Sequence, residues 1–251
     1  MIDGRVTIVT PAWRAARFVG DTIRSVQAQD YRDWEMFVVD DCSPDDTAAV
    51  VESFAAADAR VHLIRQAQNG GPAAARNAAI EAATGRYLAF LDSDDLWLPG
   101  KLSRQLAFMR SRRAVLSFTE FRRFGEGGGE PGKRMTVPDT ISYGQLLCNT
   151  AVATSTVIVD RSLAGEFRMK KTYYDDFSAW LEILKRGHLG HGLREDLMRY
   201  RIVGQSVSRN KGKSARMVWR AYREIEQLSL VDSAWCFANY ALRGWLKYRQ
   251  R

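Results

Sequence analysis

Asp92, Asp94 and Asp95 place three carboxylates within four residues, directly after the apolar run 86–91. A short apolar run that follows Gly85 predicts a buried strand, so the acids fall where this strand leaves its sheet. Carboxylates this close repel one another unless they are protonated, paired with basic groups or bound to a divalent cation. An open α/β sheet binds ligands at the carboxyl ends of its strands. The cluster therefore indicates a ligand or metal site, with a solvated acidic turn as the alternative.

The elements that precede this cluster predict a sheet with other polar groups at the same edge. Pro11 ends a first β-branched strand, and Asp40 with Asp41 ends a second. Ser43 and Pro44 predict a helix start, with Ser as the cap and Pro at the first position. Alternating strands and helices predict an α/β fold with a mostly parallel central sheet and helices on both faces. The predicted strands are 5–10, 34–39, 61–64 and 86–91, and the predicted helices are 15–29, one from 43–46 onward, and 73–83.

A second acidic pair, Asp175 and Asp176, opens a predicted helix that Gly187 ends. The helix dipole favours negative charge at an N-terminus and keeps such carboxylates ionised. Helix capping alone would also account for the pair. The other predicted elements of this half are a helix that begins at Pro99, strands 114–121 and 153–159, and a glycine-rich hairpin tip at 125–132.

Composition limits the class of protein. With 251 residues, 46% of them hydrophobic, the chain can bury a sizeable core and form one large domain or a domain with an appendage. Its three cysteines are far apart, which argues against a disulfide framework or a zinc site and suits a reducing cytosol. The sequence shows neither a signal peptide at its start nor an apolar run of about 18 residues. We therefore expect a cytoplasmic protein.

The basic charge is concentrated in the last part of the chain. Residues 199–251 hold 12 Lys and Arg against 3 Asp and Glu, whereas residues 1–198 are nearly balanced. Apolar residues from Val218 to Trp245 recur at helical spacing and predict an amphipathic helix or helix pair. This stripe either packs on the core or lies in a membrane interface, with basic residues near anionic headgroups. We expect a catalytic domain at 1–198, divided into halves 1–95 and 96–198, and a basic loop with a helical tail at 199–251.

Five stretches together resemble the family 2 glycosyltransferases, whose fold is called GT-A. They occur in the family's order across roughly residues 5–211, and five in order are far more specific than one. The resemblance implies an inverting transferase that uses a nucleotide sugar. The matching stretches are Val9 to Trp13, Val38 to Thr47, Asn69 to Asn77, Gly85 to Asp95, and Tyr174 to Leu181.

The resemblance also implies roles for residues that contact the donor. Trp13 would stack on the nucleobase, and Asp41 would accept a hydrogen bond from a base N–H, which suits uracil. Asp40 would support Asp41 or face the ribose. Arg76 would approach the base and ribose or an acidic neighbour, with a structural ion pair to Asp41 or Asp92 as the alternative. The donor-binding residues implied are Thr10, Pro11, Trp13, Asp40, Asp41, Arg76, Asp92, Ser93, Asp94, Arg209 and Lys211.

The metal and the base follow from the same resemblance. Asp94 would bind Mn²⁺ or Mg²⁺, with Asp95 as a second candidate, and the cation would neutralise charge on the nucleoside diphosphate leaving group. Asp176 would be the general base, with Asp175 as the alternative. One base and one metal-bound leaving group give a single displacement with inversion.

Two residues depart from the family pattern, one in the loop that closes over the donor and one in the first loop, after the initial strand. Val203 stands where many members have His, and Arg209 with Lys211 would then supply the positive charge over the diphosphate. Arg14 replaces a common Asn after the aromatic residue.

We expect a metal-dependent hexosyl- or N-acetylhexosaminyltransferase that uses a UDP-sugar in surface polysaccharide biosynthesis. The acceptor would be a glycan or a lipid-linked hydroxyl, and the protein could lie at the inner face of an anionic membrane. Nucleic acid is not an expected partner, since it would leave the acidic strand ends unexplained. The alternative is a catalytically weak scaffold or partner subunit.

Overall fold

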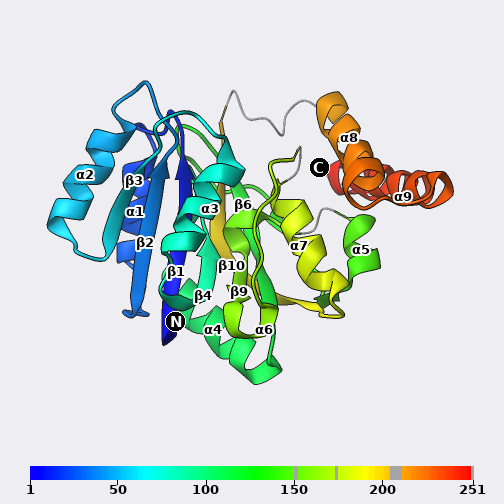
Figure 1. The fold of residues 1–251 in the computed structure, drawn as a ribbon, viewed down its shortest axis with the longest axis horizontal. Helices are drawn as coiled ribbons and strands as arrows, with labels where there is room; N and C mark the ends of the chain where they lie inside the picture. The colour runs from blue at the N-terminus through cyan, green and yellow to red at the C-terminus, as the bar shows by residue number, and fades with distance from the viewer. Residues whose placement is uncertain (150–151, 173–174, 204–210, 250–251) are drawn as a thin grey trace.

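The computed structural model describes residues 1–149, 152–172, 175–203 and 211–249. Its centre is a ten-stranded sheet in which the main path runs β3-β2-β1-β4-β9-β6-β10-β5, and helices cover both faces (Figure 1). The GT-A-like α/β architecture expected from the sequence is therefore confirmed.

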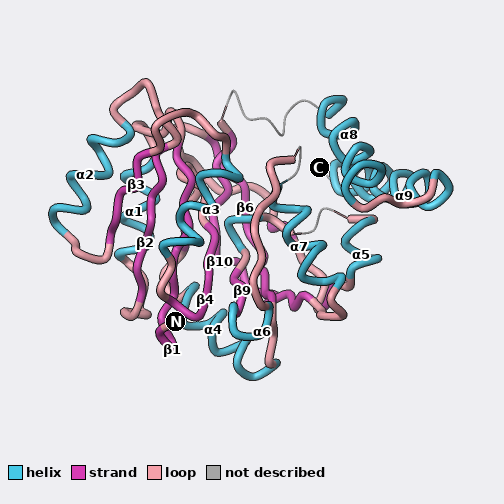
Figure 2. Tube along the Cα trace, in the orientation of Figure 1, coloured by secondary structure: helices cyan, strands magenta, loops and turns pink. Residues whose placement is uncertain are grey.

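The first half of the sheet is parallel. Strands β1 (Ile2–Ala12), β2 (Trp34–Asp40), β3 (Val61–Arg65) and β4 (Gly85–Phe90) pair side by side, and their carboxyl ends share one edge. Loops gather at this upper edge in Figure 2. The helices between the strands are α1 (Val19–Gln27), α2 (Thr47–Ala57) and α3 (Pro72–Ala82).

The second half joins the first through a short antiparallel strand. Strand β9 (Ile158–Asp160) pairs antiparallel with β4 and with β6 (Leu116–Gly125), and β6 pairs parallel with β10 (Gly190–Ile202). Since β10 runs from residue 190 to 202, the domain boundary expected at residue 198 lies inside a strand. The remaining strands are β5 (Leu96–Trp97), β7 (Arg134–Met135) and β8 (Thr140–Ile141), and the helices are α4 (Lys101–Arg112), α5 (Tyr143–Leu147), α6 (Arg161–Ala164) and α7 (Asp175–Lys185).

Each face of the sheet has its own apolar core. On one face Phe90 packs edge-on against Trp180 of α7, in a cluster that also includes residues of α3. On the other face Ile8 and Tyr87 pack with residues of α1 and α4. Alternate residues of one strand thus face different cores, and burial on both faces explains the nearly continuous apolar runs.

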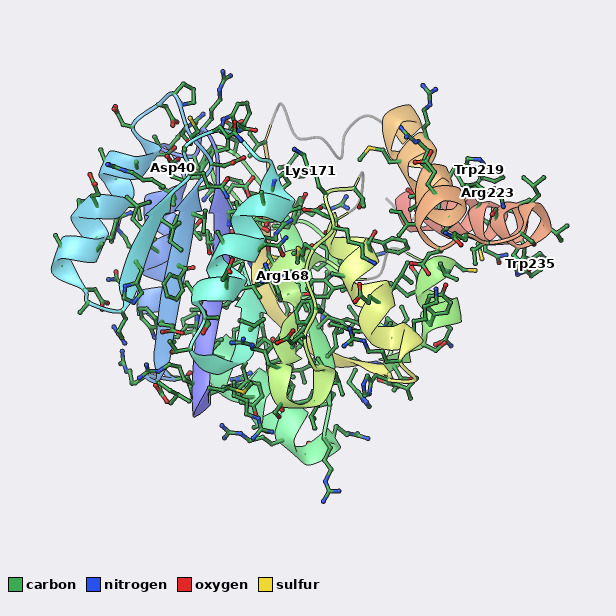
Figure 3. The ribbon with its side chains drawn as sticks, viewed as in Figure 1. Asp40, Arg168, Lys171, Trp219, Arg223 and Trp235 are labelled. Carbon is green, nitrogen blue, oxygen red and sulfur yellow. The ribbon has the colours of Figure 1, made fainter. Side chains whose placement is uncertain are left out.

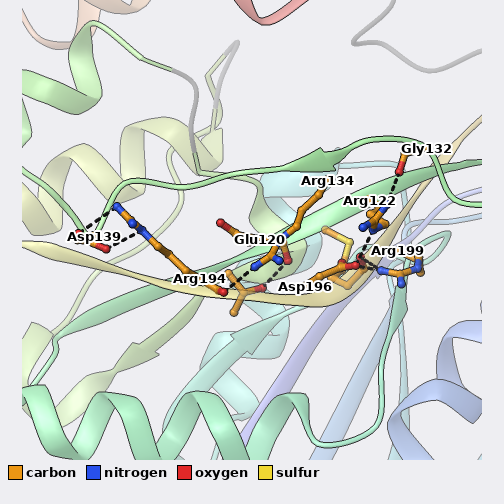
Figure 4. Close-up of polar contacts among 10 residues, drawn as sticks. Glu120, Arg122, Gly132, Arg134, Asp139, Arg194, Asp196 and Arg199 are labelled. Atoms are coloured by element: carbon orange, nitrogen blue, oxygen red, sulfur yellow. Dashed lines mark hydrogen bonds and ion pairs between the residues drawn. The ribbon is translucent and has the colours of Figure 1, made fainter. Parts of the chain in front are cut away.

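A network of ion pairs extends over the hairpin of β6 and β7 and over the neighbouring strand β10 (Figure 4). Arg122 reaches Asp196 at 2.9 Å, and Arg199 reaches the same carboxylate at 2.6 Å. Arg134 pairs with the buried Glu120 in the same network. The register of β10 shifts on both sides of Asp196, so the network lies where the strand is irregular. The glycine-rich segment expected as a hairpin tip does connect these two strands.

Two local predictions were wrong. Helix α2 begins at Thr47 rather than near Ser43, because Ser43 and Thr47 are used elsewhere: their hydroxyls accept hydrogen bonds from the Arg14 and Ala15 amides. The segment expected as a strand from residue 153 begins instead with a 3₁₀ turn, η1 (Thr154–Thr156). Its polar groups bond to neighbouring elements rather than to a strand ladder.

The tail packs on the core with one part of its apolar stripe and exposes the rest. It consists of α8 (Lys211–Arg220), a π-helical turn η3 (Ala221–Ile225) and α9 (Leu230–Arg249). Val218 and Tyr222 are buried in the core, and the Tyr222 hydroxyl donates to the Leu147 carbonyl. Val231 and Trp235, further along the stripe, are 79% and 69% exposed. No described helix is long and apolar enough to cross a membrane.

Candidate active site

The acidic turn after β4 is held at the carboxyl edge by backbone contacts. The Asp95 amide donates to the Asp92 carbonyl at 3.1 Å, which closes the turn. The hydroxyl of Thr22 on α1 donates to the carbonyls of Ser93 and Asp95, each at 2.9 Å. The three carboxylates therefore occupy fixed positions on the sheet side of α1.

Asp41 is held by the amides of a glycine turn. Its two carboxylate oxygens accept hydrogen bonds from Gly70 N at 2.7 Å and Gly71 N at 2.8 Å. Gly71 has φ +83°, a conformation that favours glycine, and a Cβ on Gly70 would lie 2.8 Å from the Ala74 Cβ. Asp40 accepts from Ser43 N at 3.3 Å. The Asn-Gly-Gly stretch thus fixes the carboxylate expected to bind the base.

Arg76 links the acidic turn after β4 to the acidic pair at the start of α7, two groups that lie far apart in the sequence. From α3 its Nη2 donates to Asp92 Oδ1 at 2.6 Å and its Nη1 donates to Asp175 Oδ2 at 3.1 Å. Burial would lower the pKa of this guanidinium, but the carboxylates of Asp92, Asp175 and Asp176 outweigh burial and raise it. Of the alternatives from the sequence, the ion pair with Asp92 is present, and a second one with Asp175 accompanies it.

Asp94 and Asp95 have raised pKa values for related reasons. Burial and the neighbouring Asp92 carboxylate raise the pKa of Asp94 to about 6, and Arg201 opposes this shift. Asp95 is 1% exposed; burial first, and then Asp94 and Asp92, raise its pKa well above 3.8. Its Oδ1 accepts from Arg201 N at 2.9 Å. This end of the sheet therefore concentrates more negative charge than its own cations neutralise.

Arg201 on β10 is the buried cation beneath the acidic turn. Its Nε donates to the Asp94 carbonyl at 2.8 Å, and its guanidinium lies between the rings of Phe18 and Phe124, at 4.8 and 4.6 Å from their centroids. Contacts with two aromatic faces hold the side chain in place.

Asp176 lies at the start of α7 and is fixed by two donors. Its Oδ1 accepts from Phe177 N at 2.7 Å, and its Oδ2 accepts from the hydroxyl of Thr154. Asp175 beside it is drawn toward Arg76, and its pKa is raised, mainly by burial. The two adjacent acids therefore have different environments.

Trp13 presents an open aromatic face near the ends of β1 and β2. Its side chain is 50% exposed, and the Arg14 guanidinium lies 4.6 Å from its ring centroid. Arg14 has φ +53°, which is unusual for a residue with a Cβ. The departure at Arg14 therefore places a cation on the ring expected to stack on the base.

Two of the site residues predicted from the sequence are almost completely buried. The side chain of Thr10 on β1 is fully buried, and its expected contact with the donor stays a prediction. Asp95 supports the acidic turn through the hydrogen bond from the Arg201 amide, and its role as a second metal ligand stays a prediction. Pro11 and Ser93 are half-buried at the edge. Arg209 and the side chain of Lys211 lie outside the described residues, so their expected roles stay predictions.

Three residues of the site were missed. Arg201, Thr154 and Ser155 contact Asp94, Asp176 and Asp92, respectively. Arg201 follows an acidic turn by more than a hundred residues, and the alternation of its strand resembles that of many surface strands. The run Thr154–Thr156 at the start of a predicted strand was the one available signal for the other two.

The residues present fit a hard cation bound together with a substrate. Among the described residues there is no group of three or more His, Cys, Asp or Glu that could hold a metal ion alone. Asp94 is only half-buried and carries a carboxylate that like charges destabilise, which is the chemistry that a divalent cation relieves. Mg²⁺ and Mn²⁺ commonly use one or two carboxylates and complete their shell with phosphate and water.

Sequence comparison gives relatives that cover nearly the whole chain. The family described as "Glycosyl transferase family 2" matches residues 7–168. The teichuronic acid biosynthesis glycosyltransferase TuaG of Bacillus subtilis (strain 168), so named, is 40% identical over 237 residues, which are 94% of each chain. The UDP-Glc:alpha-D-GlcNAc-diphosphoundecaprenol beta-1,3-glucosyltransferase WfgD of Escherichia coli is 33% identical over 249 residues, 99% of this chain and 96% of that one.

Solved structures share the fold at low identity. S. aureus TarS 1-349 in complex with UDP-GlcNAc superposes with a TM-score of 0.70 at 17% identity, over 94% of this chain and 71% of that chain. The mannosyltransferase PcManGT from Pyrobaculum calidifontis, in complex with GDP-Man and Mn²⁺, gives a TM-score of 0.71 at 17% identity, over 95% and 73%. With the sequence matches, these likenesses place the acidic edge in a known architecture, and the chain belongs to glycosyltransferase family 2.

Proposed function

We propose that this glycosyltransferase is inverting and metal-dependent, and that it transfers a sugar from a UDP-sugar to the hydroxyl of a glycan or lipid-linked acceptor in cell-surface polysaccharide biosynthesis. One observation carries the mechanism. Arg76 contacts Asp92 on the donor strand and Asp175 at the start of α7, so the acids expected for donor binding and for acceptor activation meet at one edge.

Donor binding would use the exposed ring of Trp13 and the carboxylate of Asp41. A nucleobase stacked on an aromatic ring gains about 1–3 kcal/mol, and it would displace the Arg14 guanidinium from that ring. Asp41 is oriented by Gly70 and Gly71, and each of its oxygens keeps a lone pair for the N–H of a uracil ring. The UDP-GlcNAc bound to TarS and the UDP-Glc donor in the name of WfgD support uridine as the nucleoside.

Asp176 would accept the proton of the acceptor hydroxyl as the new C–O bond forms. Among the described residues no arginine forms an ion pair with Asp176, whereas the Asp175 carboxylate pairs with Arg76. A carboxylate suffices as the base because the proton leaves only as the bond is made. Asp94 would hold Mn²⁺ or Mg²⁺, which supplies charge neutralisation at the leaving diphosphate.

Asp176→Asn and Asp175→Asn, compared side by side, test this assignment. We expect Asp176→Asn to lose about 10²–10⁴-fold in kcat while UDP-sugar still raises the unfolding temperature in the presence of Mn²⁺. Asp175→Asn should lose less activity, since its partner Arg76 retains Asp92. Retention of the donor's anomeric configuration in the product would refute the single displacement. Full turnover in Asp176→Asn would move the base to another residue.

The outer face of α9 would hold the protein at the inner surface of an anionic membrane. Four of its large apolar residues are exposed, with Leu230 at 65%, Val231 at 79%, Trp235 at 69% and Leu242 at 55%. The tail also carries most of the chain's excess basic charge, and Figure 3 shows Arg223 and Trp235 on the side away from the sheet. An amphipathic helix with aromatic and basic residues suits anionic lipid.

Vesicle sedimentation tests the membrane contact. Trp235→Glu should lose binding to vesicles that contain phosphatidylglycerol while it keeps turnover on a soluble acceptor. Leu163→Glu is the matched control, because Leu163 is 41% exposed on α6, outside the tail. Equal vesicle binding by Trp235→Glu and the control would end the membrane proposal and leave the transferase assignment untouched.

A further inference from the structure

The 3₁₀ turn η1 contacts both halves of the site through adjacent residues. The Thr154 hydroxyl donates to Asp176 Oδ2, on the acceptor side. The next residue, Ser155, accepts from the Asp92 amide at 3.0 Å, on the donor side. Both residues are buried. The adjacent residues Thr154 and Ser155 therefore connect the start of α7 to the end of the donor strand β4.

Contacts from β5 and α4 hold this turn in place. Trp97 Nε1 donates to the Ser155 carbonyl at 2.8 Å, and Gln105 Nε2 donates to the Thr156 carbonyl at 3.0 Å. The Trp97 ring is itself covered by the fully buried Lys101, whose Nζ lies 4.0 Å from the ring centroid. The Thr156 hydroxyl closes the turn by donating to the Ala153 carbonyl at 2.6 Å. A turn held by these contacts can orient the groups that it bonds to, which are the Asp176 carboxylate and the Asp92 amide.

We propose that Thr154 is a positioning residue of the transfer reaction, which orients the Asp176 carboxylate through its hydroxyl, and that Ser155 does the same for the Asp92 strand end. The inference rests on the proposed role of Asp176 as the base. Thr154 acts through the Asp176 carboxylate, and Ser155 acts through the Asp92 backbone amide.

The surroundings of Asp176 give this hydrogen bond a measurable consequence. The charged groups that face Asp176 are Asp175 on its own helix and Arg76 on α3, with Asp92 beyond Arg76. Thr154 contributes a donor with no charge. The hydrogen bond orients the carboxylate that accepts it, so loss of the hydroxyl should lower kcat and change the carbon-13 NMR signal of the Asp176 carboxyl.

Thr154→Val removes the hydroxyl at nearly constant shape, and Thr154→Ser restores it. We expect Thr154→Val to lose about tenfold in kcat, the rate equivalent of one ordinary hydrogen bond, with an unchanged KM for the donor and a shifted carbon-13 signal of the Asp176 carboxyl. Thr154→Ser should recover both kcat and the carbon-13 signal. Thr156→Val is the matched control, because its hydroxyl belongs to the same turn but donates to a backbone carbonyl. This control should keep the wild-type carbon-13 signal.

Two outcomes would overturn the inference: an unchanged kcat in Thr154→Val, or a Thr154→Ser enzyme that behaves like the valine variant. Carbon-13 NMR of the Asp176 carboxyl separates this inference from the proposed function. If Asp176→Asn kept full turnover, the base assignment would fail, yet the carbon-13 signal of Asp176 should still shift in Thr154→Val. No shift of that signal would refute the positioning role, whatever the identity of the base.

Discussion

The amino edge and the carboxyl edge of the sheet each bury a carboxylate, and the surroundings shift the pKa values of these two carboxylates in opposite directions. Glu35, near the start of β2, accepts hydrogen bonds from the Thr7 hydroxyl, from Thr84 and from the Gly85 amide. Burial raises its pKa, but these bonds outweigh burial and leave the pKa lowered. Asp95, at the other edge, accepts hydrogen bonds from the Arg201 amide and the Ser155 side chain, but burial and two like charges outweigh them and raise its pKa.

This difference separates a carboxylate that stabilises the fold from carboxylates kept for a ligand. Glu35 satisfies donors at the amino edge. Asp94 and Asp95 at the carboxyl edge gain less from the folded chain than they lose by burial and mutual repulsion. A site that waits for a cation and a substrate commonly costs stability in this way.

Removal of the main cation from the carboxyl edge should give the largest effect. Arg76→Met leaves Asp92 and Asp175 buried or half-buried without their partner, and loss of one member of a buried ion pair costs about 3–5 kcal/mol. Urea unfolding measures this loss. Arg76→Lys keeps the charge but not the forked geometry, so it should lie between wild type and Arg76→Met. Equal stability of Arg76→Met and wild type would show that the carboxyl edge does not depend on this cation.

At the amino edge, Glu35→Gln should cost about 2–3 kcal/mol, because buried donors lose a charged acceptor. Glu52→Gln is the surface control: Glu52 pairs with Arg65 at 2.6 Å, but both side chains are more than half exposed. This control should change the free energy of unfolding by less than about 0.5 kcal/mol. If Glu35→Gln lowered the free energy of unfolding no more than the control does, Glu35 would not stabilise the fold, and the proposed difference between the two edges would be wrong.

Asp95→Asn should change stability in the opposite direction. Loss of one like charge from the acidic turn should raise the free energy of unfolding by about 1 kcal/mol near pH 8. Because the pKa of Asp95 is raised, the folded protein binds this proton more tightly than the unfolded chain does, and stability falls as pH rises above about 3.8. The advantage of Asp95→Asn should therefore shrink toward pH 4. Lower stability than wild type at pH 8 would contradict this account.

The smallest effect is the acid dependence at Glu35. Its lowered pKa means that the unfolded chain binds the proton first, so the stabilisation is complete above about pH 4.5 and is lost as pH falls through the folded pKa. Unfolding of wild type and Glu35→Gln between pH 3 and 7 should show two curves that converge at the acid end. A constant gap across that range would mean that Glu35 acts through shape rather than charge.

The sequence predicted the position of the acids on the donor side better than it predicted the residues from other elements that contact the acids of the site. Asp41 and Asp94 follow apolar strands directly, so local pattern alone placed them at the correct edge. Arg201 and Thr154 reach the acids through pairings across the sheet, and no local pattern encodes such contacts. Burial of Thr10 and Asp95 was equally invisible, because the direction in which a side chain points at a strand end depends on the neighbouring elements.

The short strand β9 has a consequence for the order of folding. The parallel half from β1 to β4 consists of residues 2–90, and β1 pairs with β4 across about eighty residues, at least as far apart in the sequence as β6 and β10 are. Order of synthesis therefore separates the two halves, because domains that emerge from synthesis begin with their N-terminal part. We expect the first half to collapse before β9 docks on β4. The acidic turn would then exist for a time without Arg201, and this interval is when a nascent chain is most exposed to misfolding.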